Sequence, residues 1–478
     1  MNKKSVVTNF IWRFLERSGA QGVQFVVSII LARLLDPTVY GTIALVTVFT
    51  TIMQVFIDSG LGTALIQKKD ADDTDFSTVF YFNMAMCIVL YGVMFLIAPL
   101  IANFYEIPEL SPIVRVLSLT LIISGVRGIQ QSYVSRTMQF KRFFFSTLGA
   151  TLISAAVGIY MAYKGYGVWA LVGQTIANNL VSTAILWITV KWRPKLVFSF
   201  SRLKGLFSYG WKLLVSALID TGYREVRSLI IGKKYSSESL AFYNKAQQFP
   251  KLIVDNINTA IDSVLLPVMS SEQDDRERVK MMTRRAIKTS TYIMAPLMIG
   301  LAAVGEPLIE LLLTEKWLPC VPFLRIFCLT HMIYPIHTAN LNAIKAMGRS
   351  DKFLKLEIIK KVIGVIVLLA TMWISVEAMA YSLLFTTVLS SFINASPNKQ
   401  LLNYSYFEQI KDIAPALLLA MVMGLAVYMV GFIGLPSILT LLIQIPLGAV
   451  IYVAGSAILK LEIFNYLLDI AKKFLKRA

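Results

Sequence analysis

The sequence predicts an all-α polytopic membrane protein with about fourteen transmembrane helices. Of its 478 residues, 56% are hydrophobic and only 15% are charged, whereas a soluble protein carries roughly 25% charged residues. Apolar runs near 20 residues recur along the whole chain, and such a run crosses a hydrocarbon core of about 30 Å as a helix. The short alternating segments of a membrane β-barrel do not occur. These observations exclude a soluble enzyme and a disordered binding protein.

Each expected helix is placed on one apolar run. The predicted spans are 10–33, 38–60, 78–100, 113–133, 144–163, 167–190, 209–231, 241–267, 287–305, 320–346, 355–375, 377–396, 413–432 and 436–459. Because Arg13, Glu16 and Arg17 interrupt the first run, we expect it to be retained rather than cleaved as a signal peptide. The even number places both termini on one side of the membrane.

The net charge of +18 would suggest nucleic acid as the partner of a soluble domain, so the positions of the basic residues decide its meaning. Outside the predicted spans most of them lie on the side of the termini. The opposite loops hold four, which are Lys164, Lys233, Lys234 and Lys316. By the positive-inside rule both termini are predicted to be cytoplasmic. No nucleic-acid partner is expected.

The sequence offers no cofactor or metal motif. Cys87, Cys320 and Cys328 lack the spacing of a metal site. His331 and His337 are six residues apart and do not share a helical face as a zinc pair would. No GxxxxGK[ST] motif for ATP occurs. We therefore expect no metal and no cofactor.

The stretch 191–207 divides the chain after six spans and is predicted to form an interfacial helix. A weak repeat at an offset near 200 aligns Trp12-Arg13 with Trp211-Lys212. Two halves of equal topology follow. The predicted domains are 1–190 with spans 1–6, 191–412 with the linker and spans 7–12, and 413–478 with spans 13–14 and an amphipathic cytoplasmic tail.

Three predicted spans carry a polar face, because their polar residues recur every three or four positions. On the first span these are Arg13, Arg17, Gln21, Gln24 and Ser28. On the seventh they are Lys212, Ser216, Asp220, Arg224 and Arg227. On the eighth they are Lys245, Gln248, Asp255, Asn256, Thr259 and Asp262, with Lys251 close by.

The basic members of these faces are the predicted substrate-binding residues. They are Arg13, Arg17, Lys212, Arg224, Arg227, Lys245 and Lys251. Facing lipid, each would cost about 3 kcal/mol, or roughly 20 kcal/mol together. We therefore expect them to line a hydrated cavity for an anionic substrate, since guanidinium groups grip phosphate oxygens; diphosphates and acidic sugars qualify. The alternative is that Arg224 and Arg227 snorkel outward and that Arg13 and Arg17 anchor the inner leaflet.

Four carboxylates accompany these cations, and they are Glu16, Asp220, Asp255 and Asp262. Each either neutralises a neighbouring cation or binds the H⁺ or Na⁺ that drives transport, as intramembrane acids do. The residues alone leave both readings open.

Three segments resemble a known family. The runs WRFLERSGAQGVQFVVSIILARLLDPTVYGTIALVTVF (12–49, continuing to 80), FSRLKGLFSYGWKL (200–213) and YSSESLAFYNKAQQFPKLIVDNINTAIDSVLLPVMS (235–270) are similar to the Wzx-type polysaccharide flippases, especially the WzxC-like group. That group belongs to the multidrug/oligosaccharidyl-lipid/polysaccharide (MOP) exporter superfamily, with MATE exporters and lipid II flippases.

The resemblance implies a V-shaped transporter with two six-helix lobes and two further C-terminal helices. It implies movement of undecaprenyl-diphosphate-linked oligosaccharide across the membrane for exopolysaccharide, capsule or O-antigen synthesis, beside glycosyltransferases and a polymerase of the same pathway. Related lipid flippases have essential arginines on their first and eighth spans. Arg13 and Arg17 match the first position, and Lys245 or Lys251 matches the second loosely.

Other functions remain open. A MATE-like exporter of drugs or metabolites would use the same fold, but cationic drugs require an acidic cavity. A membrane glycan polymerase, ligase or glycosyltransferase typically has a large external loop or a clustered acid pair, and the external loops here are short. A scaffold would leave the charges within the spans unexplained. We therefore expect a transporter rather than an enzyme.

Overall fold

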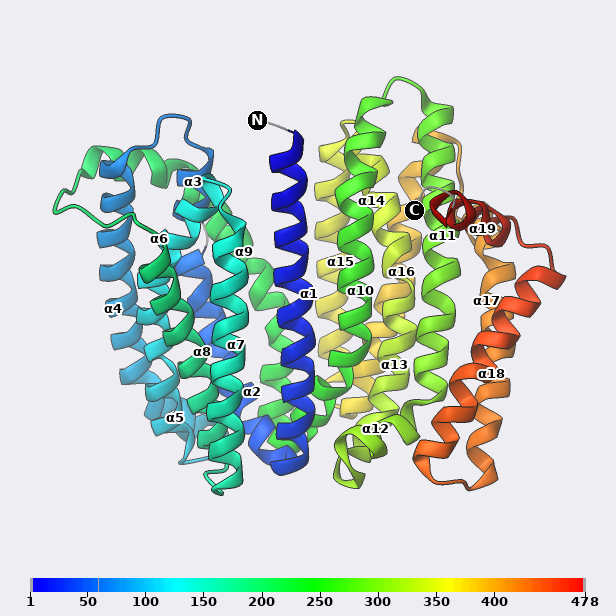
Figure 1. Ribbon diagram of the computed structural model, residues 1–478, viewed down its shortest axis with the longest axis horizontal. Coiled ribbons are helices and arrows are strands. Elements are labelled where there is room, and N and C mark those ends of the chain that lie inside the picture. The colour runs from blue at the N-terminus through cyan, green and yellow to red at the C-terminus, as the bar shows by residue number, and fades with distance from the viewer. Residues whose placement is uncertain (1–2, 59, 476–478) are drawn as a thin grey trace. The chain divides into compact units, whose positions relative to one another are not determined.

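The computed structural model describes the backbone of residues 3–58 and 60–475. Side chains are described from Gly19 onward, apart from residues 59, 209, 260, 470, 471 and 473–478. Within these residues the chain consists of α-helices and two short 3-10 helices and contains no strand (Figure 1). The predicted all-α class is confirmed.

The packing of the helices divides the chain into two compact units, Met1–Ala241 and Phe242–Ala478. The first unit contains α1 (Lys3–Leu34), α2 (Pro37–Asp58), α3 (Leu61–Gln67), α4 (Asp73–Tyr105), α5 (Leu110–Leu117), α6 (Leu119–Arg136), α7 (Phe140–Tyr163), α8 (Val168–Thr189) and α9 (Phe200–Lys234). Its α9 packs against α2. The predicted domain limits at 190 and 412 follow the proposed repeat rather than this packing, and they stay a prediction.

The second unit begins within α10 (Ser237–Ser271). It continues with α11 (Arg276–Ala303), α12 (Gly305–Leu313), η1 (Glu315–Cys320), α13 (Val321–Met332), α14 (Tyr334–Ala346), α15 (Ser350–Thr371), α16 (Val376–Leu402), α17 (Tyr406–Val430), η2 (Gly431–Ile433), α18 (Ser437–Ile458) and α19 (Glu462–Leu475). Helices α11 and α17 pack along each other, and α17 also packs on α18.

Eleven helical segments of the described chain are long and apolar enough to cross a membrane, and each coincides with a predicted span. The predicted spans 10–33, 209–231 and 355–375 fall on α1, α9 and α15. The apolar part of α1 with described side chains, Gly19–Leu34, is short. Helices α9 and α15 carry several charges along their length.

Glycine allows α9 and the first residue of α10 to approach their neighbours closely in the first unit. A Cβ on Gly60 would lie 2.4 Å from the carbonyl oxygen of Gly210, and the φ of Gly60 is +91°. A Cβ on Gly41 would lie 1.7 Å from the carbonyl oxygen of Ser237. Larger residues would force these backbones apart, because no real Cβ tolerates such distances.

The interfacial helix predicted over 191–207 is wrong for residues 191–199, which are not helical. Pro194 disfavours helical backbone in the residue before it. The backbone N–H groups of Lys195 and Ser199 donate instead to the hydroxyls of Ser77 (2.9 Å) and Thr78 (3.1 Å) on α4. The linker is therefore fixed to the start of α4, and α9 begins only at Phe200.

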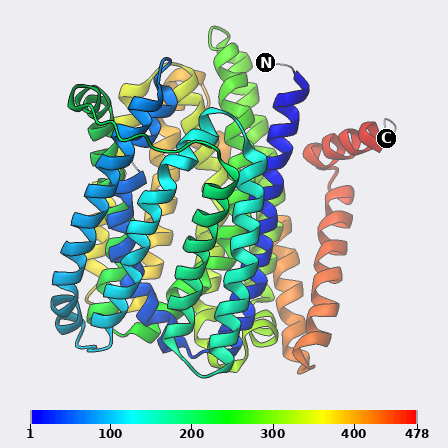
Figure 2. The same cartoon turned by 60° about the vertical axis from the view of Figure 1, so that its left-hand side comes forward.

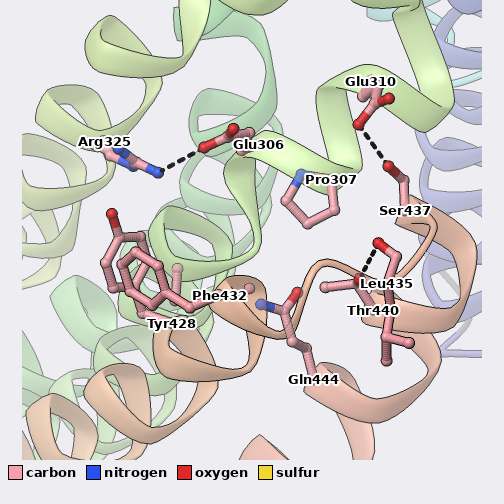
Figure 3. Close-up of a pocket in the computed structure, with 12 residues that line it drawn as sticks. Glu306, Pro307, Glu310, Arg325, Tyr428, Phe432, Leu435, Ser437, Thr440 and Gln444 are labelled. Carbon is pink, nitrogen blue, oxygen red and sulfur yellow. Dashed lines mark hydrogen bonds and ion pairs between the residues drawn. The ribbon is translucent and has the colours of Figure 1, made fainter.

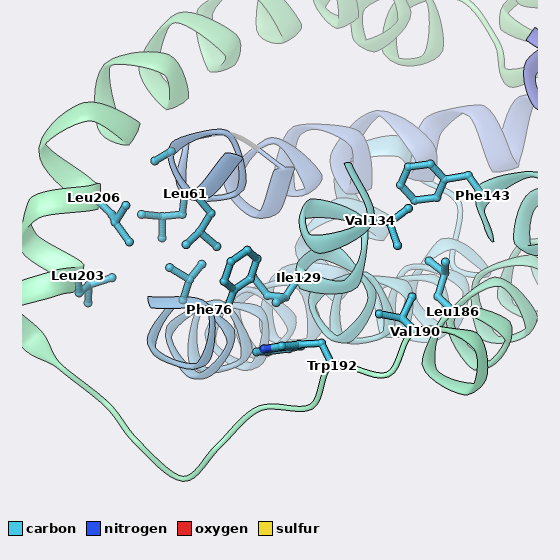
Figure 4. Close-up of a cluster of buried hydrophobic side chains, with 13 residues drawn as sticks. Leu61, Phe76, Ile129, Val134, Phe143, Leu186, Val190, Trp192, Leu203 and Leu206 are labelled. Carbon is cyan, nitrogen blue, oxygen red and sulfur yellow. The ribbon is translucent and has the colours of Figure 1, made fainter. Parts of the chain in front are cut away.

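A buried apolar cluster holds this linker in place (Figure 4). The indole of Trp192 stacks on Tyr133, with ring centroids 6.2 Å apart, and contacts Phe76 at 5.7 Å. Leu203 and Leu206 bring the first turns of α9 into the same cluster. The start of α9 is thus packed on α3, α4 and α6.

The C-terminal tail forms the predicted amphipathic helix over α19. This helix lies across the direction of α18 (Figure 2). Its Ile463 is 7% exposed, Glu462 forms an ion pair with Lys288 of α11, and Tyr466 lies under the guanidinium of Arg285 at 4.9 Å. The helix packs on α11 and α18, with Ile463, Phe464 and Leu467 against the apolar cluster and two polar contacts to α11.

Candidate functional site: charged faces of the α9 and α10 helices

Helix α9 is packed at its two ends and open along its middle. Its buried residues are Leu203, Leu206, Gly210, Thr221 and Ile231, and none of residues 211–220 is buried. Lys212, Ser216 and Arg224 are exposed. Three of the polar residues predicted for the seventh span therefore lie on open parts of α9.

An exposed ion pair lies near the middle of α9. Arg224 Nε lies 3.4 Å from Asp220 Oδ2, and the two side chains are 64% and 50% exposed. Asp220 lies 14 residues before the helix end at Lys234, or about 21 Å along the axis. The next basic residue, Arg227, is half-buried. Inside a membrane such a charged pair requires water or a polar ligand rather than hydrocarbon; that α9 is a membrane span stays a prediction.

Helix α10 places its predicted residues in two environments. Lys245 is 5% exposed, and its ammonium lies 5.6 Å from the ring centroid of Trp317 in η1. Lys251 and Asp255 are exposed one turn apart. The structure therefore separates Lys245, which is covered by η1, from the open part of the helix.

Asp262 continues the open part of α10 and has a partner that the sequence did not reveal. Its Oδ1 accepts a hydrogen bond from the side-chain amide of Asn342 on α14 at 2.7 Å. Asn342 is itself buried. The amide fixes this carboxylate while the rest of the side chain stays exposed.

The side chains of Arg13, Glu16 and Arg17 lie outside the described residues. On the described part of α1, Gln24 is exposed and Gln21 and Ser28 are half-buried. Val27 and Leu31 are buried in a cluster with residues of α7 and α8. Helix α1 thus packs in this cluster and leaves Gln24 exposed.

Among the described residues, no three His, Cys, Asp or Glu side chains come together as metal ligands. The predicted residues Lys212, Asp220, Arg224 and Arg227 share α9 in the first unit, and Lys251, Asp255 and Asp262 share α10 in the second. Each helix therefore carries its own charged face, and coupling-ion binding by the carboxylates stays a prediction.

A polar pocket in the second unit was not predicted. Glu306 and Glu310 of α12, Arg325 of α13 and Gln444 of α18 line it (Figure 3). The signal in the sequence was the pair of glutamates one helical turn apart directly after a span. Gln444 gave a weaker signal, as a single amide within an apolar run.

The comparisons with known proteins agree with this fold. A family model described as "Polysaccharide biosynthesis protein" matches residues 30–322. The succinoglycan biosynthesis transport protein ExoT of Rhizobium meliloti is 24% identical over 100% of this chain and 98% of its own. The lipopolysaccharide biosynthesis protein WzxC of Escherichia coli is 23% identical over 71% of this chain and 69% of its own. The resemblance to the WzxC-like group is confirmed.

Solved structures show the same architecture. The lipid II flippase MurJ in an inward closed conformation aligns with a TM-score of 0.75 at 16% identity, over 94% of this chain and 98% of its own. An inward-facing multidrug resistance MATE transporter of the MOP superfamily aligns with a TM-score of 0.62 at 15% identity, over 82% of this chain and 98% of its own. The fold is that of the MOP superfamily. With eleven apolar spanning segments and a family match over more than half its length, the chain is a multi-pass membrane protein that belongs to the polysaccharide biosynthesis protein family.

Proposed function

We propose that this protein is a flippase that moves undecaprenyl-diphosphate-linked oligosaccharide units across the bacterial cytoplasmic membrane by alternating access. The product would serve exopolysaccharide, capsule or O-antigen synthesis, together with glycosyltransferases and a polymerase of the same pathway. The family match, the transport role in the name of ExoT and the fold shared with a lipid II flippase support this proposal.

The proposal includes the finer topology. Helices α1, α9 and α15 cross the membrane in addition to the eleven apolar segments, which gives fourteen crossings and two cytoplasmic termini. Residues 1–190 and 191–412 form two six-helix lobes in a V-shaped arrangement, and 413–478 adds two helices and the tail. An even number of crossings and the basic loops on the side of the termini support this arrangement.

One observation carries the assignment of the site. Lys212 and the Arg224–Asp220 pair are exposed within one long helix, and in the proposed topology contact with lipid would be costly for them. Exposed guanidinium and ammonium groups suit a diphosphate or an acidic sugar. In the proposal Arg13, Arg17, Lys212, Arg224, Arg227 and Lys251 contact the headgroup, while the polyprenyl tail stays in lipid. Lys245 supports the basic surface from beneath η1.

The protein would act without a cofactor and without making or breaking a bond in its substrate. The driving ion would be H⁺ or Na⁺, bound by Glu16, Asp220, Asp255 or Asp262. Asp262 is the best positioned of the three described carboxylates, because the hydrogen bond from Asn342 fixes its geometry.

The test neutralises one cation at a time in a strain that lacks the natural gene. Arg17→Gln, Lys212→Gln and Arg224→Gln are expected to reduce surface polysaccharide and to leave lipid-linked repeat units on the cytoplasmic side. Lys204→Gln is the matched control, because Lys204 is also exposed on α9 but lies in its second turn. Surface sugar analysis and membrane content of each variant are the measurements.

If all three variants are inserted in the membrane and export glycan at the wild-type rate, these three residues do not bind the substrate. A deletion strain that accumulates no lipid-linked repeat units would count against the flippase itself. If that strain instead became sensitive to cationic drugs, the MATE-like exporter would be the better reading of the fold.

A further inference from the structure

The pocket between α12, α13, α17 and α18 lies entirely within the second unit (Figure 3). Its volume is about 290 Å³, at the lower end of the roughly 300–1,000 Å³ range of ligand pockets. Such a space suits one small ring rather than an extended molecule. The pocket is separate from the charged faces of α9 and α10.

A buried amide forms one wall of this pocket. Gln444 is 1% exposed, and its Nε2 donates to the carbonyl oxygen of Val427 at 2.9 Å. This bond fixes the amide, yet its Oε1 is buried without a hydrogen-bond partner. Figure 3 shows the amide between Phe432 and Thr440. A buried acceptor left unpaired is unfavourable, so the site is prepared for a ligand that donates.

Two carboxylates provide further acceptors. Glu310 Oε2 accepts from the hydroxyl of Ser437 at 2.5 Å, which orients it. Glu306 Oε2 lies 3.6 Å from Arg325 Nη2, beyond hydrogen-bond distance, and that Nη2 has no hydrogen-bond partner. The pocket therefore offers several acceptors and one guanidinium donor.

Aromatic rings complete the site. The guanidinium of Arg325 lies 5.2 Å from the ring centroid of Tyr428, and Phe432 is 76% exposed at the rim. A neutral sugar ring matches this set, because its hydroxyls donate to carboxylates and amides and accept from arginine. Its C–H face packs on an aromatic ring, whose face is electron-rich.

Charge distinguishes this ligand from two others. Arg325 lies 3.6 Å from Glu306 and the hydroxyl of Ser437 donates to Glu310, so both carboxylates already have a partner and neither is left to pair with an organic cation. Glu306 and Glu310 disfavour a phosphate. We propose that the pocket binds one neutral pyranose ring, and, resting on the proposed function, that this ring belongs to the transported glycan.

The experiment titrates the purified full-length chain in lipid nanodiscs with methyl glucoside, methyl galactoside and methyl mannoside. Choline and inorganic phosphate are the comparison probes, and saturation-transfer NMR reports binding. We expect saturable millimolar binding of at least one pyranoside. Glu310→Gln should weaken it about tenfold, while Glu315→Gln, an exposed carboxylate outside the pocket, should leave it unchanged.

A second variant fills the pocket with a larger apolar side chain and so tests the proposal without changing a charge. Gly431 lines the pocket with an ordinary φ of −60°, and a Cβ there would lie 3.8 Å from Gln444 Nε2. Gly431→Leu should abolish pyranoside binding, whereas Ile433→Ala in the same turn should not. Three results would overturn the proposal. They are saturable binding of choline or phosphate but of no pyranoside, binding of no probe at all, and pyranoside binding by Gly431→Leu that is as strong as in the wild type.

The outcomes separate this proposal from the proposed function. If the chain binds a pyranoside but exports no glycan, the pocket proposal is supported and the flippase proposal is contradicted. If export depends on Arg224 but the pocket binds no pyranoside, the flippase proposal is supported and the pocket proposal is contradicted.

Discussion

The first turns of α9 and its middle use charge in opposite ways. At its start, Arg202 lies 3.5 Å from the fully buried Asp75, which also pairs with Lys68 at 2.7 Å, next to the packed linker. In its middle, Asp220 and Arg224 pair at 3.4 Å but remain exposed. Buried pairs lose much when one partner is removed, whereas exposed pairs contribute little to stability. One helix thus carries charges that stabilise the fold at its start and charges that stay exposed in its middle.

The largest expected effect is on stability, at the packed start of α9 and its linker. Trp192→Ala should lower the free energy of unfolding by about 3–5 kcal/mol, because it removes a large side chain from the buried cluster. Trp192→Phe should cost about 1 kcal/mol, since it mainly loses the hydrogen bond from Nε1 to Asp73 (3.1 Å). Thermal unfolding in detergent measures both. Equal midpoints for the two variants would contradict the packing role.

The next effect concerns the buried charge. Asp75→Asn should destabilise the protein by about 2–4 kcal/mol, because Asp75 is 0% exposed and lies 2.7 Å from Lys68 Nζ. Asp73→Asn is the matched control. Asp73 pairs with Lys195, but both side chains are about half exposed or more, so its loss should cost less than about 1 kcal/mol. A larger loss of stability in Asp73→Asn than in Asp75→Asn would contradict the assignment of Asp75 as the residue that stabilises the fold.

In the middle of α9, stability and transport should separate. Asp220→Asn and Arg224→Gln should each change the free energy of unfolding by less than about 0.5 kcal/mol. Glycan export should fall at least tenfold in Arg224→Gln if the face binds substrate. Unfolding midpoints and surface polysaccharide are measured on the same preparations. Normal export with a large stability loss would make this pair structural.

The smallest effect is the response of the packed end to pH. The hydrogen bond from Arg202 lowers the pKa of Asp72 to about 2, from about 3.9 in an unfolded chain. A lowered pKa means that the stabilisation is complete above about pH 4 and is lost as the pH falls through about 2. The exposed pair contributes less than about 1 kcal/mol.

Asp72→Asn tests this response without removing the helix cap, because asparagine also caps helices. The difference in midpoint between wild type and Asp72→Asn should be the same at pH 7 and pH 5 and should shrink toward pH 3. A difference that grows on acidification would assign the pH response to another group.

Helix positions could be predicted because apolar runs of spanning length are a local signal. The fold of residues 191–199 could not, since it depends on Ser77 and Thr78, more than a hundred residues away. The periodicity predicted a polar face with Lys212 and Arg224; both are exposed, and their contact with substrate stays a prediction. It also placed Lys245 on such a face, but η1 folds over that residue. Gln444 looked like part of an apolar span, because its pocket is made by helices distant in sequence.

The anchoring of the linker also has a consequence for biosynthesis. Asp75 pairs with Lys68, which is only seven residues away in the sequence. Asp73 instead contacts Trp192, 119 residues downstream, and Asp72 contacts Arg202, 130 residues downstream. At about 5–20 residues per second, that delay is roughly 6–26 s of translation. During this interval the start of α4 carries carboxylates without their final partners. The start of α4 therefore gains its final contacts only after helices α1 to α8 have been synthesised, when Trp192 and Arg202 reach Asp73 and Asp72.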